Sequence, residues 1–274
     1  MTRDFADPSL LDALTQIASE AGHAIMRVRQ AGATIRTKAD ASPVTEADEA
    51  AEAIILDGLA RTLPGIVVVS EEAASEGSLP ELSDTFILVD PLDGTREFID
   101  GRDEFTVNIA IVRNGRPISG IVGAPALNAI WRGAIGAGSE RLRLQPGAAP
   151  KDATERIALR TRAHQGGPWR AMVSRSHLDP KTEEWLTRFA EVSRMDCGSS
   201  VKFCRIAEGQ ADVYPRLGRT SEWDIAAGDA VLSAAGGAVV SLDGALVRYG
   251  QLARELKVPS FVAWCDPGDA AKYG

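Results

Sequence analysis

The chain reads Phe86-Ile87-Leu88-Val89-Asp90-Pro91-Leu92-Asp93-Gly94-Thr95 where a run of four apolar residues meets two carboxylates. Four apolar residues followed by an acid predict a buried strand that places Asp90 at its end. Pro91 has no N–H to donate to a sheet, so we expect the strand to stop there. Asp90, the Leu92 carbonyl and Asp93 offer the hard oxygen ligands that Mg²⁺ prefers.

A short polar segment follows, Arg96-Glu97-Phe98-Ile99, and it predicts one helical turn opened by Gly94 and Thr95. Free amide groups at such a start bind phosphate. A cation site beside a phosphate site is the arrangement of a metal-dependent phosphatase. The simpler alternative is an Asp-Gly turn with solvated aspartates. The preceding strand and the acids elsewhere in the chain favour the phosphatase interpretation.

Length and composition indicate a globular protein. The chain has 274 residues, 45% of them apolar and 25% charged, which suits one large domain or two modest ones. Its 30 basic and 38 acidic residues give a net charge of −8, which argues against binding a nucleic acid polymer. A small phosphorylated ligand can still be held by local cations.

Cysteine usage and the chain ends indicate a reducing compartment. Cys197, Cys204 and Cys265 lack the spacing of a zinc site and do not form a disulfide framework. The first residues carry no apolar signal core, and no apolar run reaches membrane-spanning length. We therefore expect a cytoplasmic protein without an integral membrane segment, and peripheral attachment to a membrane stays open.

Two helices are predicted near the start of the chain. Asp7 caps a segment whose apolar residues recur at helical spacing as far as Ile25, and a second helix is predicted from about Thr45 to Leu63. The polar, proline-broken segment Lys38–Val44 between them predicts a loop.

Strands follow these helices. The run Ile66–Ser70 predicts a buried strand that delivers Glu71 at its end. Further strands are predicted over 105–112, 118–122 and 129–135, with a hairpin turn at Asn114-Gly115. Two helices followed by several antiparallel strands predict a layered α+β half.

The second half alternates between helices and strands. Pro146, Gly147 and Pro150 mark residues 145–154 as the junction, so we divide the chain into residues 1–145 and 146–274. Strands are predicted at 169–174, 212–214, 239–240 and 261–264, and helices at 180–190, 201–208 and from Ser221 to Gly236. This pattern predicts a sheet layered with helices.

Four acids lie at predicted strand ends or at a helix start: Glu71, Asp90, Asp93 and Asp224. Carboxylates that converge from different elements repel one another unless cations neutralise them. Taken singly, Glu71 fits a solvated loop residue and Asp224 an acid stabilised by a helix N-terminus. The set as a whole favours a metal site.

Three motifs resemble the inositol monophosphatase superfamily of Mg²⁺-dependent, lithium-sensitive phosphatases. They are Glu71-Glu72 after a strand, Asp90-Pro91-Leu92-Asp93-Gly94-Thr95, and Trp223-Asp224-Ile225-Ala226-Ala227-Gly228. The resemblance runs in order from about Lys38 to Gly237. It implies an α/β sugar-phosphatase fold, an αβαβα sandwich, and a homodimer by family habit.

Further segments are similar to the CysQ-type 3'(2'),5'-bisphosphate nucleotidases within that superfamily. They are Lys38–Asp48, Arg96–Ile99, Glu104–Ala110, Val173–His177, Gly198–Cys204 and Ala207–Arg216. The resemblance implies hydrolysis of 3'-phosphoadenosine 5'-phosphate (adenosine 3',5'-bisphosphate) to AMP and phosphate, a reaction linked to sulfate assimilation. Arg96 stands where lysine is common in this subfamily, and the charge is kept.

The resemblance also implies a role for each residue of the reaction centre. Two or three Mg²⁺ ions would be held by Glu71, Asp90, the Leu92 carbonyl, Asp93 and Asp224. Thr95, hydrogen-bonded to Asp48, would orient the attacking water, with Glu71 sharing in catalysis. Gly94 and Thr95 amides, beside Asp93, would hold the phosphate. Read alone, Asp48 fits a solvated residue on an alanine-rich helix.

Four residues match positions that contact the nucleotide in relatives: His177, Ser199, Lys202 and Arg216. Lys202 and Arg216 carry charge suited to a second phosphate. The alternative for these two is a pair of surface cations. His177 alone fits a structural histidine after a strand.

We therefore expect a Mg²⁺-dependent phosphomonoesterase acting on a small bisphosphate nucleotide. An inositol monophosphatase, or another sugar or histidinol phosphatase, on the same scaffold is the first alternative. A non-enzymatic metal or nucleotide binder is the second, and the water-orienting Thr95 argues against it.

Overall fold

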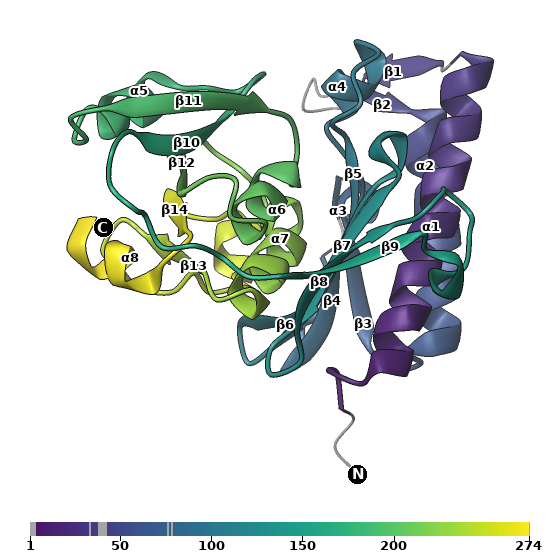
Figure 1. The fold of residues 1–274 in the computed structure, drawn as a ribbon. Helices are drawn as coiled ribbons and strands as arrows, with labels where there is room; N and C mark the ends of the chain where they lie inside the picture. Colours follow the sequence, from purple (N-terminus) through teal and green to yellow (C-terminus); the bar gives the residue numbers. More distant parts are fainter. Residues whose placement is uncertain (1–3, 33, 38–42, 76, 78, 274) are drawn as a thin grey trace.

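The computed structural model describes residues 4–273 except 33, 38–42, 76 and 78. Its elements stack in five layers (Figure 1). Two long helices cover one face of a seven-stranded sheet, two more helices fill the middle, and a five-stranded sheet with two short helices completes the other side. The expected αβαβα sandwich is confirmed.

The outer helical layer consists of α1 (Pro8–Ala31) and α2 (Glu46–Thr62), close to the predicted bounds. The Asp7 side chain caps α1 by accepting from the Ser9 amide, and Thr45 caps α2. Between them, β1 (Ile35–Thr37) and β2 (Pro43–Thr45) pair antiparallel. The loop predicted over Lys38–Val44 therefore gives way to a strand at Pro43, and residues 38–42 lie outside the described residues.

The large sheet follows chain order from β3 to β9. Its strands are β3 (Val67–Ser70), β4 (Thr85–Asp93), β5 (Thr106–Arg113), β6 (Arg116–Ala124), β7 (Ala129–Ala134), β8 (Gly138–Arg143) and β9 (Glu155–Leu159). Only the β3–β4 pair is parallel among these described strands. Asn114 and Gly115 form the predicted hairpin turn, both at positive φ. Strands β8 and β9 were not predicted.

Strand β4 is buried on both faces, which explains its continuous apolar run. Phe86 and Leu88 pack into the core between the two sheets, while Ile87 and Val89 face the core under α1 and α2. The prediction that Pro91 ends the strand was wrong. Pairing resumes at Asp93 after a bulge, and the bulge accommodates a residue that cannot donate to the ladder.

The second sheet has the order β11-β10-β12-β14-β13. Its strands are β10 (Trp169–Ser174), β11 (Val192–Cys197), β12 (Val213–Arg216), β13 (Ala238–Ser241) and β14 (Phe261–Trp264). Helices α5 (Pro180–Leu186) and α8 (Pro267–Tyr273) cover its outer face around Trp169, Trp185 and Trp264. Strand β11 and helix α8 were not predicted, and α5 ends four residues earlier than expected.

The predicted junction at 145–154 does not separate the two sheets. Strand β9 comes after it and still pairs with β8 in the large sheet. The chain passes to the second sheet only between Leu159 and Trp169. The segment itself carries a single 3-10 turn, Pro150–Asp152, and similar turns occur at Pro125–Leu127 and Leu252–Arg254.

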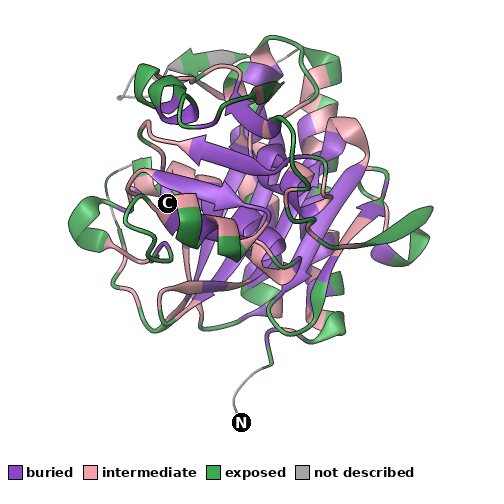
Figure 2. Ribbon diagram, turned by 60° about the vertical axis from the view of Figure 1, so that its left-hand side comes forward, coloured by how far each residue is buried: buried purple, intermediate pink, exposed green. Residues whose placement is uncertain are grey.

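The middle layer is formed by α6 (Val201–Ala207) and α7 (Glu222–Ala234), which lie between the sheets. Most residues of α7 are buried (Figure 2), and a single hydrophobic cluster joins residues of both sheets with α6 and α7. Helix α7 approaches β6 closely because Gly120 carries no side chain there. Among the described helices, none combines the length and apolar character that crossing a bilayer requires.

Adding a methyl group at Gly120 should therefore weaken the fold. A Cβ there would lie 2.5 Å from the Ala227 carbonyl oxygen and 2.8 Å from the Ala230 Cβ. We expect Gly120→Ala to lower the free energy of unfolding by about 1–3 kcal/mol, as overpacked cores do. Urea denaturation measures this change.

Gly123→Ala, on the same strand, is the matched control. Its added Cβ would meet nothing closer than 3.8 Å, so stability should stay level or rise. Equal losses for both variants would contradict the close approach of α7 to β6.

Candidate active site

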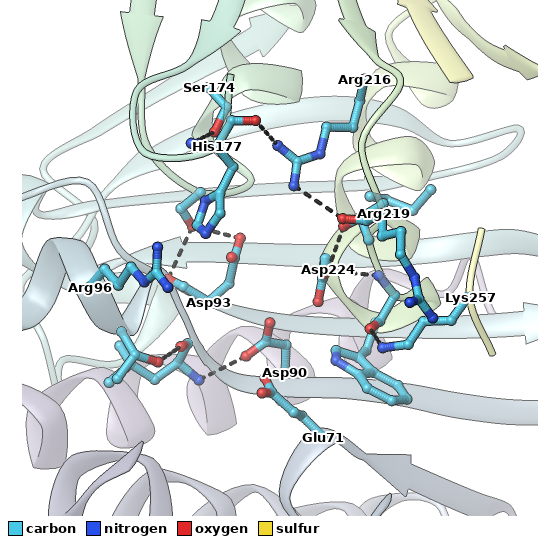
Figure 3. A pocket seen from close by; sticks show the side chains of 18 of the residues that line it. Glu71, Asp90, Asp93, Arg96, Ser174, His177, Arg216, Arg219, Asp224 and Lys257 are labelled. Atoms are coloured by element: carbon cyan, nitrogen blue, oxygen red, sulfur yellow. Dashed lines mark hydrogen bonds between the residues drawn. The ribbon is translucent and has the colours of Figure 1, made fainter. Parts of the chain in front are cut away.

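A pocket of about 780 Å³ opens between the two halves, at the end of β4 and the start of α7. The structure brings almost all predicted site residues to its wall: Glu71, Asp90, Leu92, Asp93, Gly94, Thr95, His177, Ser199, Lys202, Arg216 and Asp224. Asp48 lies behind the wall, bonded to Thr95. Figure 3 shows carboxylates from both halves pointing into the same space.

Three carboxylates converge at the floor of the pocket. Glu71 starts α3 (Glu71–Ser75) directly after β3, Asp90 lies in β4, and Asp224 lies in the first turn of α7. One oxygen from each lies within 4.8 Å of the other two. Residues as distant in the chain as Glu71 and Asp224 thus form one acidic cluster.

This cluster is electrostatically strained. Burial, and then the negative charge of Glu71, raise the pKa of Asp90 well above its ordinary value. Burial, followed by the charges of Asp93 and Glu71, raises the pKa of Asp224 to about 7. Hydrogen bonds from Thr220 and the Ser221 amide partly offset the cost of ionising Asp224.

Asp93 lies beside the cluster but is also engaged with the second half. Its Oδ2 accepts hydrogen bonds from the Ser199 hydroxyl at 2.7 Å, the Ser200 amide at 2.7 Å and the Ser200 hydroxyl at 2.9 Å. Its charge still contributes to the raised pKa of Asp90 and Asp224. Asp93 therefore connects the carboxylate cluster to the segment before α6.

Thr95 and Asp48 form the hydrogen-bonded pair expected from the sequence. The Thr95 hydroxyl lies 3.3 Å from Asp48 Oδ1 and 3.2 Å from the Leu92 carbonyl oxygen. Asp48 is only 2% exposed, and its Oδ2 accepts from both the amide and the hydroxyl of Thr45 at 2.8 Å. The interpretation of Asp48 as a solvated helix residue is excluded.

Gly94 gives the chain its turn from β4 into α4 (Thr95–Ile99). Its φ of 89° is in the left-handed region, which side chains disfavour. A Cβ would also lie 3.3 Å from the Glu104 carbonyl oxygen and from the Ser199 Cβ. Glycine therefore lets the two halves meet at the pocket floor.

The cations expected to contact a nucleotide are partly committed to the protein. Lys202 is 4% exposed, and its Nζ donates to the carbonyls of Ser199 at 2.6 Å and Cys197 at 3.4 Å. The Arg216 guanidinium donates to the carbonyls of His177 and Arg219. The alternative of Lys202 as a surface cation is excluded.

His177 lies at the pocket wall between arginines. Partial burial of the ring lowers the pKa of His177, and the charges of Arg216 and Arg96 lower it further. The imidazole is therefore neutral at neutral pH, where it can donate or accept a hydrogen bond. This environment is poorly suited to holding a proton for transfer.

Two acids that hydrogen-bond across the boundary between the halves were not predicted from the sequence. Glu97, 3% exposed, accepts from the Ser176 hydroxyl, and Glu104 pairs with Arg175 and accepts from the Gly198 amide. Both lie within motifs quoted above, but their partners come from the other half. Only the tertiary fold reveals these contacts.

Arg219 and Lys257 also line the pocket and were not predicted. Lys257 reaches it because its backbone bridges to Ser221, a pairing with no signal in the sequence. Arg219 lies shortly before the motif that carries Asp224. This proximity in the chain was the one feature of the sequence that could have indicated a role for Arg219 in the site.

The donor set fits a divalent cation. The charge of Glu71 raises the pKa of both Asp90 and Asp224, and a bound cation removes that repulsion. Oxygen ligands without nearby thiolates suit a hard ion.

Comparison with known sequences gives a family match over most of the chain. The profile of the Inositol monophosphatase family matches residues 7–264. The 3'(2'),5'-bisphosphate nucleotidase CysQ of Escherichia coli K12 is 41% identical over 243 residues, covering 88% of this chain and 94% of the relative. The protein of that name from Buchnera aphidicola is 34% identical over 255 residues, covering 89% of each.

Solved structures agree with this match. The crystal structure of CysQ from Bacteroides thetaiotaomicron, described as a bacterial member of the inositol monophosphatase family, superposes with a TM-score of 0.77 at 34% identity. The match covers 93% of this chain and 97% of that one. The suhB protein of Bartonella henselae has a TM-score of 0.75 at 24% identity, covering 97% and 96%, which shows the fold alone.

Without divalent cations, the contribution of Asp224 to the free energy of unfolding should fall as the pH rises from about 4 through 7. The pKa of Asp224 rises from 3.8 to about 7 on folding, so folding favours the protonated carboxyl. Its contribution is complete below pH 3.8 and lost as the pH passes the folded value. In EDTA at pH 8, Asp224→Asn should therefore be more stable than the wild type, by about 1–2 kcal/mol after allowance for solvent screening.

Urea denaturation at pH 4 to 8 measures the difference, with the exposed Asp84→Asn as the control. Adding Mg²⁺ at pH 8 should stabilise the wild type more than the Asp224 variant. If the free energy of unfolding depended on pH in the same way for the wild type and the Asp224 variant, this would contradict the repulsion that we infer within the cluster.

Proposed function

The chain belongs to the inositol monophosphatase family, and we propose that it removes the 3'-phosphate of 3'-phosphoadenosine 5'-phosphate, giving AMP and phosphate. It is a phosphatase. The carboxylate cluster beside the Thr95–Asp48 pair carries the proposal for the chemistry. Sequence identity above 40% to 3'(2'),5'-bisphosphate nucleotidases, over 88% of the chain, supports 3'-phosphoadenosine 5'-phosphate as the substrate.

We propose Mg²⁺ as the cation, with two or three ions per site. Glu71, Asp90 and Asp224 would hold it, together with Asp93 and the carbonyl of Leu92. Bound there, such an ion supplies Lewis acidity toward the phosphoryl oxygens and lowers the pKa of water. The raised pKa of Asp90 and Asp224 supports a cation at this position rather than four solvated acids.

Thr95 and Asp48 orient the attacking water in this proposal. A hydroxyl has one proton to donate and lone pairs that accept. When Thr95 donates its proton to Asp48, its lone pairs are free to accept from a water, which fixes that water's oxygen toward phosphorus. Asp48 is held for this purpose by two bonds from Thr45. Glu71, which like Thr95 belongs to the first half of the chain, completes the catalytic set.

The phosphate and nucleoside are bound on the remaining walls. Amides of Gly94 and Thr95 at the start of α4 would bind the scissile phosphate beside Asp93. His177 and Ser199 line the second half of the pocket with Lys202 and Arg216, where the nucleoside would lie. The neutral ring of His177 suits a hydrogen bond to base or sugar rather than proton transfer.

Other attributes of the protein follow as proposals from the same premise. Three buried, unpaired thiols support a cytoplasmic location. A homodimer and a division into two folding units near the middle of the chain stay predictions.

A substrate panel tests the proposed function. With Mg²⁺, phosphate release should be much faster from adenosine 3',5'-bisphosphate than from inositol 1-phosphate or fructose 1,6-bisphosphate, compared as kcat/KM. Asp93→Asn, which lacks one negative charge at the cluster, should lose turnover at saturating Mg²⁺ and keep its fold. Li⁺ should inhibit the wild type.

Preference for inositol 1-phosphate would replace the nucleotidase by the inositol phosphatase alternative. Phosphate release unaffected by EDTA, or near-normal turnover by the Asp93 variant, would contradict the metal site. A protein that hydrolyses none of the three substrates would leave the non-enzymatic binder as the better description.

Thr95→Ala should lower kcat by about 10²–10⁴-fold with little change in KM, because an orienting group acts in the transition state. Asp48→Asn should lower kcat less. The double variant should lose less than the product of the two single losses, because both residues act through one hydrogen bond. Steady-state kinetics measure all three, with Thr95→Ser as the control that keeps the hydroxyl. Fully multiplicative losses would mean that the pair does not work as a unit.

A further inference from the structure

We propose that Arg219 and Lys257 bind the second phosphate of the substrate, the one that is not hydrolysed. This inference rests on the proposed nucleotidase function and assigns the residues that separate a bisphosphate from a monophosphate. Both residues line the pocket on the side of α7. Figure 3 shows them together on one side of the carboxylates, with Arg96 on the other.

The direction of the reaction places the leaving nucleoside near these residues. In phosphoryl transfer the attacking and leaving oxygens lie roughly in line across phosphorus. Thr95 and Asp48, which orient the water, belong to the first half of the chain. The leaving oxygen then departs toward the second half, which contributes Asp224 and the wall behind it. A second phosphate on the nucleoside must meet a cation of that wall.

Four cations line the pocket from the second half: Lys202, Arg216, Arg219 and Lys257. The Lys202 ammonium uses two of its three N–H donors on backbone carbonyls, and the Arg216 guanidinium donates to two further backbone carbonyls. These bonds fix the segment around Ser199 and the loops at His177 and Arg219. Neither cation can bind a phosphate with its full set of donors without releasing the loops that it holds.

Arg219 has its donors available. Within the described part of the chain, its guanidinium has no hydrogen-bond or ion-pair partner, and the residue is exposed at the pocket rim. Its backbone is nevertheless held, because the Arg219 carbonyl accepts from Arg216 and the Thr220 carbonyl from the Val258 amide. A guanidinium on a fixed backbone is suited to donating two parallel hydrogen bonds to one phosphate.

Lys257 stands beside Arg219 through the same local pairing. Its backbone bridges to Ser221, its Nζ donates to the Ser221 hydroxyl at 2.7 Å, and the ammonium lies 5.5 Å from the centre of the Trp223 ring. Two N–H donors are left for a ligand. Among the described residues of this wall, Glu255 is the one acid that lines the pocket outside the carboxylate cluster of Asp224, so Arg219 and Lys257 give the wall beyond the cluster a net positive charge.

Arg96 is the competing candidate. It follows Thr95 on α4 and lies beside Asp93 and His177, next to the proposed position of the scissile phosphate. A loss of Arg96 should therefore affect monophosphate and bisphosphate alike. A loss of Arg219 should affect the bisphosphate alone.

The test compares adenosine 3',5'-bisphosphate with 3'-AMP, which lacks the second phosphate. The second phosphate is bound equally before and during the reaction, so its loss should raise KM and leave kcat nearly unchanged. We expect Arg219→Ala to raise KM for the bisphosphate about 10- to 100-fold, the range for a hydrogen bond to a charged group. Lys257→Ala should act in the same direction. KM and kcat for 3'-AMP should stay within about twofold.

Arg254→Ala is the matched control. Arg254 is exposed, close to Lys257 in the chain and not part of the pocket wall, so it reports the effect of net charge alone. An equal rise in KM for Arg254→Ala would overturn the proposal in favour of general electrostatic attraction. Equal losses of Arg219→Ala on both substrates would also overturn it, as would a bisphosphate-specific loss that appears with Arg96→Ala and not with Arg219→Ala.

The same measurements separate this inference from the proposed function. If the wild type prefers the bisphosphate to 3'-AMP and Arg219→Ala keeps that preference, only the assignment of Arg219 and Lys257 fails. If the wild type shows no preference for the bisphosphate, or hydrolyses neither nucleotide, both fail together. Thermal unfolding of each variant checks that its fold is intact.

Discussion

Repulsion among Glu71, Asp90 and Asp224 must be overcome whenever the protein folds. Three carboxylate oxygens within 4.8 Å, one of them on a residue 1% exposed, oppose folding at neutral pH unless a cation is present. The packing around them has to supply the energy that holds them there. Strand β4 is buried on both faces, and α7 lies against the large sheet over Gly120, so the cluster sits between two of the best-packed elements of the molecule. A bound cation would then return part of this energy as stability.

The site also joins the two halves, which explains why its side chains make so many contacts across the boundary. Asp93 accepts three hydrogen bonds from Ser199 and Ser200, and the Asn108 amide donates to the Ser200 hydroxyl. Glu97 accepts from Ser176 on the neighbouring loop. These contacts fix the wall that we propose to bind the nucleoside relative to the floor that we propose to bind the scissile phosphate. Positioning of this kind is where enzymes gain much of their rate, and small displacements are costly.

The sequence predicted the elements whose signal is local and missed those defined by their partners. The apolar run before Asp90, the two long helices and the hairpin at Asn114 each carry their own pattern. Strands β8, β9 and β11 carry mixed polar residues, and β9 and β11 lie at sheet edges, where alternation is weak. The acids of the site could be predicted because strand ends and helix starts fix their positions. The direction of Lys202 could not, because no local rule says that its ammonium meets the carbonyls of Cys197 and Ser199.

The reacting groups and the wall that faces the leaving group come from different kinds of element, which suggests how one scaffold can serve several phosphate esters. The acids and Thr95 come mainly from the large sheet and α7, whereas the wall facing the leaving group comes from loops of the second half, and loops tolerate substitution better than packed elements. The tolerance has a limit next to Asp224. Thr220 and Ser221 donate hydrogen bonds to the Asp224 carboxylate, so a change in their backbone would disturb the acidic cluster itself. Arg219, one residue earlier, projects a side chain into the pocket without touching that carboxylate. Under the assignment proposed for Arg219, substitution at position 219 changes substrate selectivity and keeps the geometry of the reacting groups.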